Sequence, residues 1–126
     1  MRTLLIATRN AGKAAEVVRV LQELPLELIT LGDYSDLPEI EETGLTFREN
    51  AIQKARFFAA LTGELTLADD SGLEVDALGG APGVRSARFA PTDEKRNKKL
   101  LELMRDVPDE ARTARFRCVI ALATPE

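Results

Sequence analysis

Short apolar runs alternate along this chain with segments in which apolar residues recur at helical spacing. The predicted strands are residues 3–7, 26–31, 65–68 and 113–124. The predicted helices are residues 14–24, 46–62 and 92–105. Because strands separated by helices are typical of α/β folds, the sequence predicts an α/β domain with a mixed β-sheet flanked by helices.

Length, composition and charge set further limits. A chain of 126 residues with 44% hydrophobic content is long enough for one domain, predicted over residues 1–126. A net charge of −4 argues against a protein that binds duplex nucleic acid by neutralising many phosphates. The apolar stretch Leu4 to Ala7 is too short for a secretory core or a membrane span, so the expected location is the cytoplasm. The single cysteine, Cys118, lies in an apolar run and is expected to be a buried, reduced thiol.

Histidine is absent from the sequence. This excludes Ser-His-Asp triads, histidine general bases and histidine metal ligands. Carboxylates, lysines and hydroxyls remain, and carboxylate oxygens prefer hard cations. Magnesium is therefore the expected metal, rather than zinc.

Two adjacent carboxylates, Asp69 and Asp70, follow the apolar run that ends at Ala68. We expect the strand to end there and Ser71-Gly72 to form a turn. Successive side chains of an extended segment point to opposite faces, so one aspartate is expected to bind metal or activate water and the other to brace the turn. The alternative is a pair of solvent-facing carboxylates in an ordinary turn.

The segment Thr8 to Lys13 joins the first predicted strand to the first predicted helix. Helix N–H groups, a hydroxyl, an amide and two cations could converge there on one anion. The spacing is not that of a Walker A loop. The alternative is an ordinary strand-to-helix turn with Asn10 as the cap and Lys13 in solvent.

The second helix carries clear local signals. Thr46 and Glu49 form a predicted capping box, in which the glutamate returns to the N–H of the cap, and Gly63 is the predicted stop. Just before this helix, Glu41 and Glu42 could complete an oxygen cage for magnesium with one aspartate. Two cations of the helix, Arg48 and Lys54, are by default surface residues, with a phosphate contact as the alternative.

The second half of the chain begins with a long loop predicted over residues 79–91. A third helix follows, with Thr92 or Asp93 as its cap. Its inward residues are predicted to be Leu100, Leu101 and Met104. Its solvated face is predicted to consist of Lys95, Arg96, Lys98 and Lys99.

Three segments, residues 4–13 (LLIATRNAGK), 41–55 (EETGLTFRENAIQKA) and 68–89 (ADDSGLEVDALGGAPGVRSARF), resemble the Ham1/inosine triphosphate pyrophosphatase family, and the likeness continues through residues 115–124. The resemblance implies an ITPase-like fold of the Maf/Ham1 type with an active-site groove along one side. It implies cleavage of ITP, dITP or XTP between the α- and β-phosphates, with Mg²⁺, to give the monophosphate and pyrophosphate. Homodimers are common among such relatives.

The resemblance also implies roles for residues at matched positions. Asp70 resembles the general base that activates water and helps to bind metal, and Glu42 resembles its metal partner. Lys54 resembles a further phosphate contact, and Ser71 resembles a substrate-binding hydroxyl. The triphosphate-binding loop is implied over Thr8, Arg9, Asn10, Ala11, Gly12 and Lys13.

Members of this family continue past the point where this sequence ends. Their next segment holds a glycine-aromatic-aspartate-proline motif and then a serine-histidine-arginine motif, and both are absent here. We therefore expect a fold that is incomplete at the C-terminus, with apolar faces left open. Two hypotheses stay open: a nucleotide pyrophosphatase, or a non-catalytic phosphate- or nucleotide-binding fragment that needs a further chain to complete its site.

Overall fold

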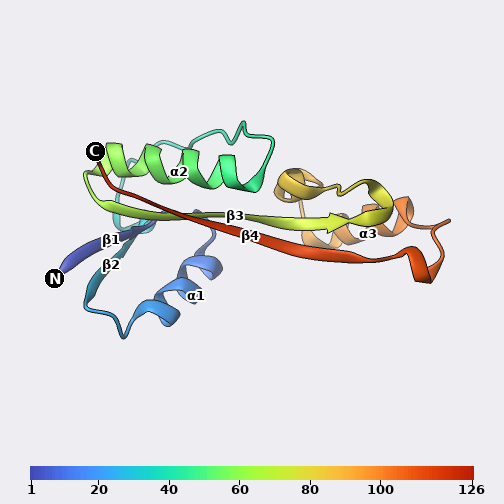
Figure 1. The fold of residues 1–126 in the computed structure, drawn as a ribbon, viewed down its shortest axis with the longest axis horizontal. Coiled ribbons are helices and arrows are strands. Elements are labelled where there is room, and N and C mark those ends of the chain that lie inside the picture. The colour runs from blue at the N-terminus through green and yellow to red at the C-terminus, as the bar shows by residue number, and fades with distance from the viewer. The chain divides into compact units, whose positions relative to one another are not determined.

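The computed structural model describes residues 1–126, in which strands and helices follow one another as the sequence predicts (Figure 1). The strands are β1 (Arg2–Ile6), β2 (Leu26–Thr30), β3 (Leu65–Val75) and β4 (Ala114–Ala123). The α-helices are α1 (Ala11–Leu21), α2 (Phe47–Thr62) and α3 (Asp93–Leu103). None of these helices combines the length and the apolar character needed to span a lipid bilayer.

The four strands form one sheet in the order β2-β1-β3-β4. The central strand β1 pairs in parallel with β2, where Ile6 lies opposite Thr30, and with β3, where Ile6 lies opposite Leu67. The predicted mixed sheet flanked by helices is confirmed. Because parallel strands run in the same direction, the chain after Ile6 leaves the sheet beside the residues that follow Leu67, which remain in β3.

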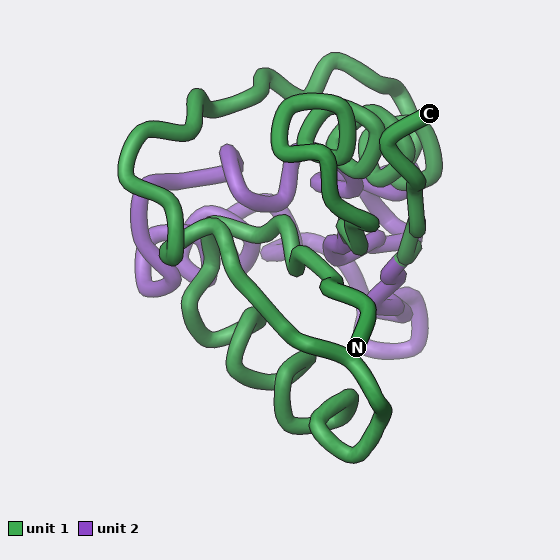
Figure 2. Tube along the Cα trace, turned by 90° about the vertical axis from the view of Figure 1, so that its left-hand side faces the viewer, with its two compact units in different colours: residues 1–70, 119–126 green, residues 71–118 purple.

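The chain consists of two compact units, each with many contacts within itself, which Figure 2 shows in different colours. The first consists of residues 1–70 and 119–126, and the second of residues 71–118. The single domain over residues 1–126 stays a prediction.

The core of the first unit lies between α2 and the sheet. Helix α2 buries a row of small and aromatic side chains, and the alanines in that row let its backbone approach the strands closely. In Figure 1, α1 and α2 lie on opposite sides of the strands of this unit. The buried apolar cluster consists of Leu5, Ala7, Leu31, Ala55, Phe58 and Ala68.

The ends of α2 confirm the local signals, with one correction. The hydroxyl of Thr46 accepts the N–H of Glu49 at 3.1 Å, and Gly63 ends the helix in the left-handed region with φ 74°. The Glu49 carboxylate, however, accepts the N–H of Leu45 at 3.0 Å, one residue before the predicted partner. Both side chains of the capping box therefore accept a backbone N–H, but the partner of Glu49 is one residue earlier than predicted.

Strand β3 is much longer than predicted. It does not end at Ala68 but continues through Asp69 and Asp70 to Val75, so the predicted turn at Ser71-Gly72 is wrong. Its alternate positions, including Ala68, Asp70 and Gly72, stay buried on one face. A glycine often marks a turn, but here the neighbouring strand β4 supplies a hydrogen-bonded partner that extends the strand.

In the second unit, the region predicted as a loop over residues 79–91 contains a 3₁₀-helix at Gly83–Arg88. Helix α3 holds this region with its cations: the Arg96 guanidinium donates to the carbonyl oxygens of Ala87 and Ala90, at 2.9 and 3.0 Å. Lys99 donates to the carbonyl of Phe89 at 3.1 Å, and its ammonium lies 4.4 Å from the centre of that ring. The prediction of a solvated basic face is therefore wrong for Arg96, which is half-buried, whereas Lys99 makes these contacts and is exposed as predicted.

The apolar face predicted for α3 is confirmed in part. Met104, the residue that caps its end, is buried, whereas Leu101 is 64% exposed. The expectation of a buried thiol is also wrong, because Cys118 is exposed. Strand β4 is the last in the strand order, so one edge of it has no strand neighbour in the sheet. Its side chains Phe116, Ile120 and Leu122 are exposed as well.

Candidate active site

The turn between β1 and α1 is built by side chains that bond to its own backbone. The hydroxyl of Thr8 accepts the N–H of Asn10 at 3.2 Å, and the Asn10 side chain accepts the N–H of Lys13 at 3.1 Å. Asn10 is therefore the N-cap of α1, and the helix begins at Ala11, three residues earlier than predicted. A cap at Asn10 is what the alternative of an ordinary strand-to-helix turn predicts. The N-terminus of α1 nevertheless lies at this turn, and anion binding by its N–H groups stays a prediction.

Arg9 of this turn bonds to a distant segment, whereas Ala11 and Gly12 belong to helix α1. The Arg9 guanidinium donates to the carbonyl oxygens of Leu37 and Pro38, at 2.9 and 3.0 Å, so it fastens the segment after β2. Ala11 and Gly12 form the first turn of α1, with their backbone N–H groups at its N-terminus.

Asp70 is the buried acidic group of the site. Its side chain comes from β3, is only 8% exposed and accepts a hydrogen bond from Asn50 of α2 at 3.1 Å. Burial raises the pKa of Asp70 from 3.8 to about 6; the bond from Asn50 opposes this rise, and the negative charge of Glu42 adds to it. A carboxylate with this pKa is well matched to proton transfer near neutral pH.

Lys54 of α2 joins the two acidic segments. Its ammonium lies 2.6 Å from a carboxylate oxygen of Glu42 and donates to the main-chain carbonyl of Asp69 at 3.0 Å. The Lys54 side chain is only 15% exposed, so the default prediction of a surface cation is wrong for it. Arg48, in contrast, is exposed as that prediction requires.

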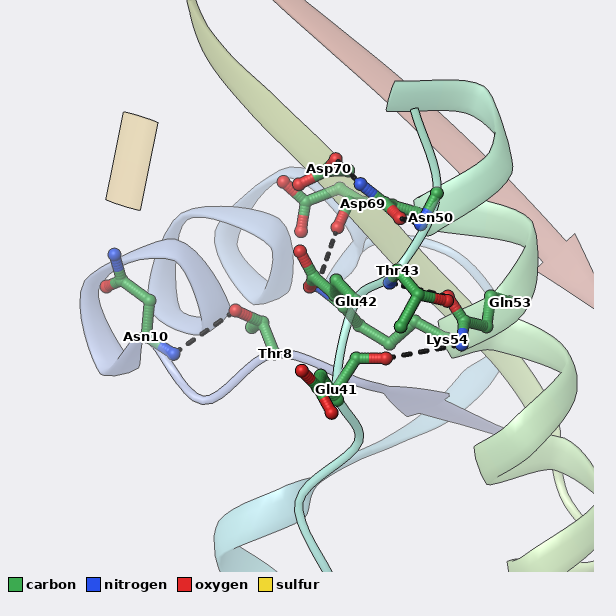
Figure 3. A network of polar contacts seen from close by, with 11 residues as sticks. Thr8, Asn10, Glu41, Glu42, Thr43, Asn50, Gln53, Lys54, Asp69 and Asp70 are labelled. Carbon is green, nitrogen blue, oxygen red and sulfur yellow. Dashed lines mark hydrogen bonds and ion pairs between the residues drawn. The ribbon is translucent and has the colours of Figure 1, made fainter. Parts of the chain in front are cut away.

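The segment before α2 is held by side chains of that helix (Figure 3). Gln53 accepts the N–H of Thr43 at 3.4 Å and donates to the carbonyl of Glu41 at 3.2 Å. Asn50 accepts the N–H of Gly44 at 2.7 Å. These bonds fix the backbone on both sides of Glu42.

Sequence reasoning missed Asn50 and Gln53. Together with Lys54 they stand at positions i, i+3 and i+4 of α2, which is the spacing of one helix face. A polar row inside an otherwise apolar and small-residue face was the available signal.

Strand register brings the turn at Thr8 beside the aspartates of β3. The N–H of Ala7 donates to the carbonyl of Leu67 at 2.8 Å, and continuing this register places Thr8 level with Asp69. The predicted triphosphate-binding turn therefore begins beside the stretch of β3 that carries the predicted base. Ser71 lies next in β3, is exposed and belongs to the second unit; its predicted contact with substrate stays a prediction.

Magnesium stays a prediction, and the carboxylates Glu42 and Asp70 are ligands of the kind that this ion prefers. A carboxylate taken out of water is stabilised by a nearby cation, and both Glu42 and Asp69 add negative charge around Asp70. No group of three or more acidic or cysteine side chains forms a ligand set by itself. Mg²⁺ usually takes only one or two carboxylates together with waters and substrate phosphates, so Glu42 and Asp70 could hold it with a bound triphosphate.

A separate cavity of about 630 Å³ lies along α1 and the residues that follow β2. It shares Thr8, Arg9 and Ala11 with the turn described above, but Glu42, Lys54 and Asp70 do not line it. The walls of this cavity are mostly apolar, whereas the candidate site consists of charged and polar side chains.

Comparison with known proteins agrees with the resemblance. The family model described as "Ham1 family" matches residues 4–126. The chain is 53% identical to the dITP/XTP pyrophosphatase of Geobacter sulfurreducens, covering 99% of this chain and 64% of that protein. It is 54% identical to the dITP/XTP pyrophosphatase of Desulforamulus reducens, covering 97% of this chain and 62% of that protein. The chain thus spans less than two thirds of the length of these relatives.

Solved structures give the same result. A HAM1 protein from Coxiella burnetii superposes with a TM-score of 0.87 at 47% identity, covering 97% of this chain and 63% of that one. The Ham1 protein of Staphylococcus aureus superposes with a TM-score of 0.85 at 37% identity, covering 98% and 64%. On its sequence and on its fold, this chain belongs to the Ham1 family.

Proposed function

We propose that the protein hydrolyses the non-canonical purine nucleotides ITP, dITP and XTP to the monophosphate and pyrophosphate. The observation that carries the proposal is the position of Asp70, a buried carboxylate of β3 whose neighbour Asp69 lies level with Thr8 when the register of β1 and β3 is continued. Relatives about 50% identical that are named dITP/XTP pyrophosphatases support the substrate class.

Asp70 acts in this proposal as the general base. It accepts a proton from the attacking water, whose oxygen forms a bond to the α-phosphorus while the bond from that phosphorus to the bridging oxygen breaks and pyrophosphate leaves. The burial of Asp70 and its hydrogen bond from Asn50 hold this carboxylate in one place for the proton transfer.

The triphosphate is bound by groups that carry or supply positive charge. The N-terminus of α1, with Asn10 as its cap and Lys13 in its first turn, offers N–H groups and a cation to phosphate oxygens. Lys54 lies beside Glu42 and Asp69 and supplies a second ammonium. Donors fixed before the substrate arrives stabilise the charge that develops on oxygen during attack.

Magnesium belongs to this proposal as the expected cofactor, with Glu42 and Asp70 as its protein ligands. When bound, it neutralises charge on the phosphate oxygens and orients the triphosphate. The negative charge that Glu42 places near Asp70 supports it, because Mg²⁺ prefers carboxylate oxygens.

Pyrophosphate release by the purified chain tests the proposal. The substrates are ITP, dITP, XTP, ATP and GTP, each assayed with Mg²⁺ and with EDTA. We expect pyrophosphate from the first three, much less from ATP and GTP, and none with EDTA. Binding of ITP without any pyrophosphate release would instead favour the alternative of a non-catalytic nucleotide-binding fragment. Cytoplasmic location and a homodimer belong to the same proposal.

A further inference from the structure

We propose that Asn50 is a positioning residue that fixes the carboxylate of Asp70 relative to the segment that carries Glu42. This inference rests on the proposed function. Asn50 is 1% exposed and lies in α2, twenty residues from Asp70 in the sequence.

The two bonds of Asn50 determine how its amide is oriented. Its Nδ2 donates to Oδ2 of Asp70 at 3.1 Å, and its Oδ1 accepts the N–H of Gly44 at 2.7 Å. A main-chain N–H only donates and an ionised carboxylate only accepts, so the amide cannot be turned over without losing both bonds. Figure 3 shows this side chain between Asp70 and the segment before α2.

The bond to Asp70 distinguishes its two oxygens. Because Oδ2 is held by the amide, rotation of the carboxyl group is restricted and Oδ1 takes a defined direction. A general base needs such a fixed direction, since its lone pair must point at the proton that it accepts. Asn50 does not accept that proton itself and acts through Asp70.

The bond to Gly44 also holds the backbone of the segment that carries Glu42. Gly44 stands two residues after Glu42, so one side chain sets the separation between the proposed base and the segment of its metal partner. The approach is close: a Cβ at position 44 would lie 2.6 Å from Oδ1 of Asn50 and 2.7 Å from the Cβ of Glu49. Only glycine lets Asn50 approach the backbone in this way.

The choice of residue at position 50 also argues for a positioning role. The neighbouring buried positions Ala51, Ala55 and Ala59 are alanines, which favour helix and pack closely. Asparagine is less favourable in a helix interior, and its buried amide is tolerated only because both of its polar ends are bonded. A residue selected for packing alone would not need this donor and acceptor.

Steady-state kinetics of ITP hydrolysis with Mg²⁺ tests the role. Asn50→Leu keeps the approximate size of the side chain and removes both bonds. We expect kcat to fall about 10- to 100-fold, as is typical when the partner of a catalytic or metal-binding group is removed, with little change in KM. An unchanged kcat, or a rise in KM alone, would overturn the proposal.

Two further variants separate positioning from stability. Gly44→Ala leaves Asn50 in place but pushes its Oδ1 aside, so we expect kcat to fall in the same direction. Thr46→Ala removes the cap of α2 and contacts neither Asp70 nor Gly44, so kcat should stay at the wild-type value. Equal losses of kcat in N50L and T46A, at matched losses of unfolding temperature, would contradict a positioning role.

Crystal structures of the wild-type chain and N50L give a readout that does not depend on activity. We expect the Asp70 carboxyl group to adopt another rotamer in N50L, with the segment at Gly44 displaced. An unchanged Asp70 would overturn the proposal even if kcat fell. If the wild-type chain releases no pyrophosphate, the proposed function fails, and the structures still decide whether Asn50 positions Asp70.

Discussion

The ammonium of Lys54 lies 2.6 Å from the carboxylate of Glu42, and this ion pair ties helix α2 to the acidic segment that precedes it. Neither partner is fully exposed, with side-chain exposures of 15% and 27%. The pair is therefore less screened by water than a surface salt bridge, and it holds Glu42 beside the edge of β3.

A double-mutant cycle measures this pair. Lys54→Met, Glu42→Gln and the double variant are compared by urea unfolding at pH 7. We expect a coupling free energy of about 1 kcal/mol, above that of a typical surface pair and below that of a fully buried one. A coupling near zero would show that the ion pair does not contribute to holding the segment.

Asp70→Asn tests the proposed base. The amide has nearly the shape of the carboxyl group but cannot accept the proton, so we expect kcat to fall by about 10² to 10⁴-fold while the unfolding temperature is kept. The exposed residue Asp36 provides the control, since Asp36→Asn makes the same chemical change away from the site. Full magnesium-dependent activity in D70N would show that the base is another group.

Asn10→Asp separates capping from phosphate binding. An aspartate oxygen still accepts the N–H of Lys13, so the stability of α1 is kept, but its negative charge repels a triphosphate. We expect an unchanged unfolding temperature and a raised KM for ITP. Asn10→Ala removes the cap and should lower the free energy of unfolding by about 1 kcal/mol.

The matched control for this change lies in the second unit, where Thr92 caps α3 through the N–H of Lys95. Thr92→Asp keeps a capping oxygen and adds the same charge at another helix N-terminus. We expect its KM to equal that of the wild type. Equal KM values for T92D and N10D would contradict a phosphate site at α1.

Acid sensitivity of the second unit is expected at Asp76. The hydroxyl of Thr113 donates to its carboxylate at 2.6 Å, and this bond, followed by the Arg115 guanidinium, holds the pKa of Asp76 below its ordinary value. A lowered pKa in the folded state means that the stabilising contribution is present above the unfolded pKa and is lost as the pH falls through the folded value. Thr113→Val should therefore flatten the fall of unfolding temperature with acid.

Thermal unfolding measured from pH 7 down to pH 2 checks this expectation. Asp76→Asn serves as the reference, because it removes the titrating group altogether. T113V should approach the profile of D76N. A T113V profile identical to that of the wild type would show that the Thr113 hydroxyl does not perturb Asp76.

Local chemistry was sufficient to predict much of this protein. The cap at Thr46 and the left-handed glycine at Gly63 bound α2 as expected, because both signals act within a few residues of the helix end. The order of strands and helices and the mixed sheet flanked by helices were also predicted, because alternating apolar runs and helical segments are typical of α/β folds.

The features that were mispredicted depend on partners far along the chain. β3 continues past Gly72 because β4 pairs with it, and Lys54 is drawn out of solvent because Glu42 and the carbonyl of Asp69 bind its ammonium. Cys118 is exposed in β4, where Phe116 and Ile120 are exposed as well. Propensity and periodicity carry no information about such neighbours.

The amino-acid sequence by itself determined the order of strands and helices and the acidic and cationic residues available for chemistry. Tertiary structure decided which of them meet: Asn50 and Asp70 are twenty residues apart and bond only because α2 packs against β3. The physical reason is that helix caps and periodicity are short-range, whereas burial, which raises the pKa of Asp70, is produced by the whole packed unit.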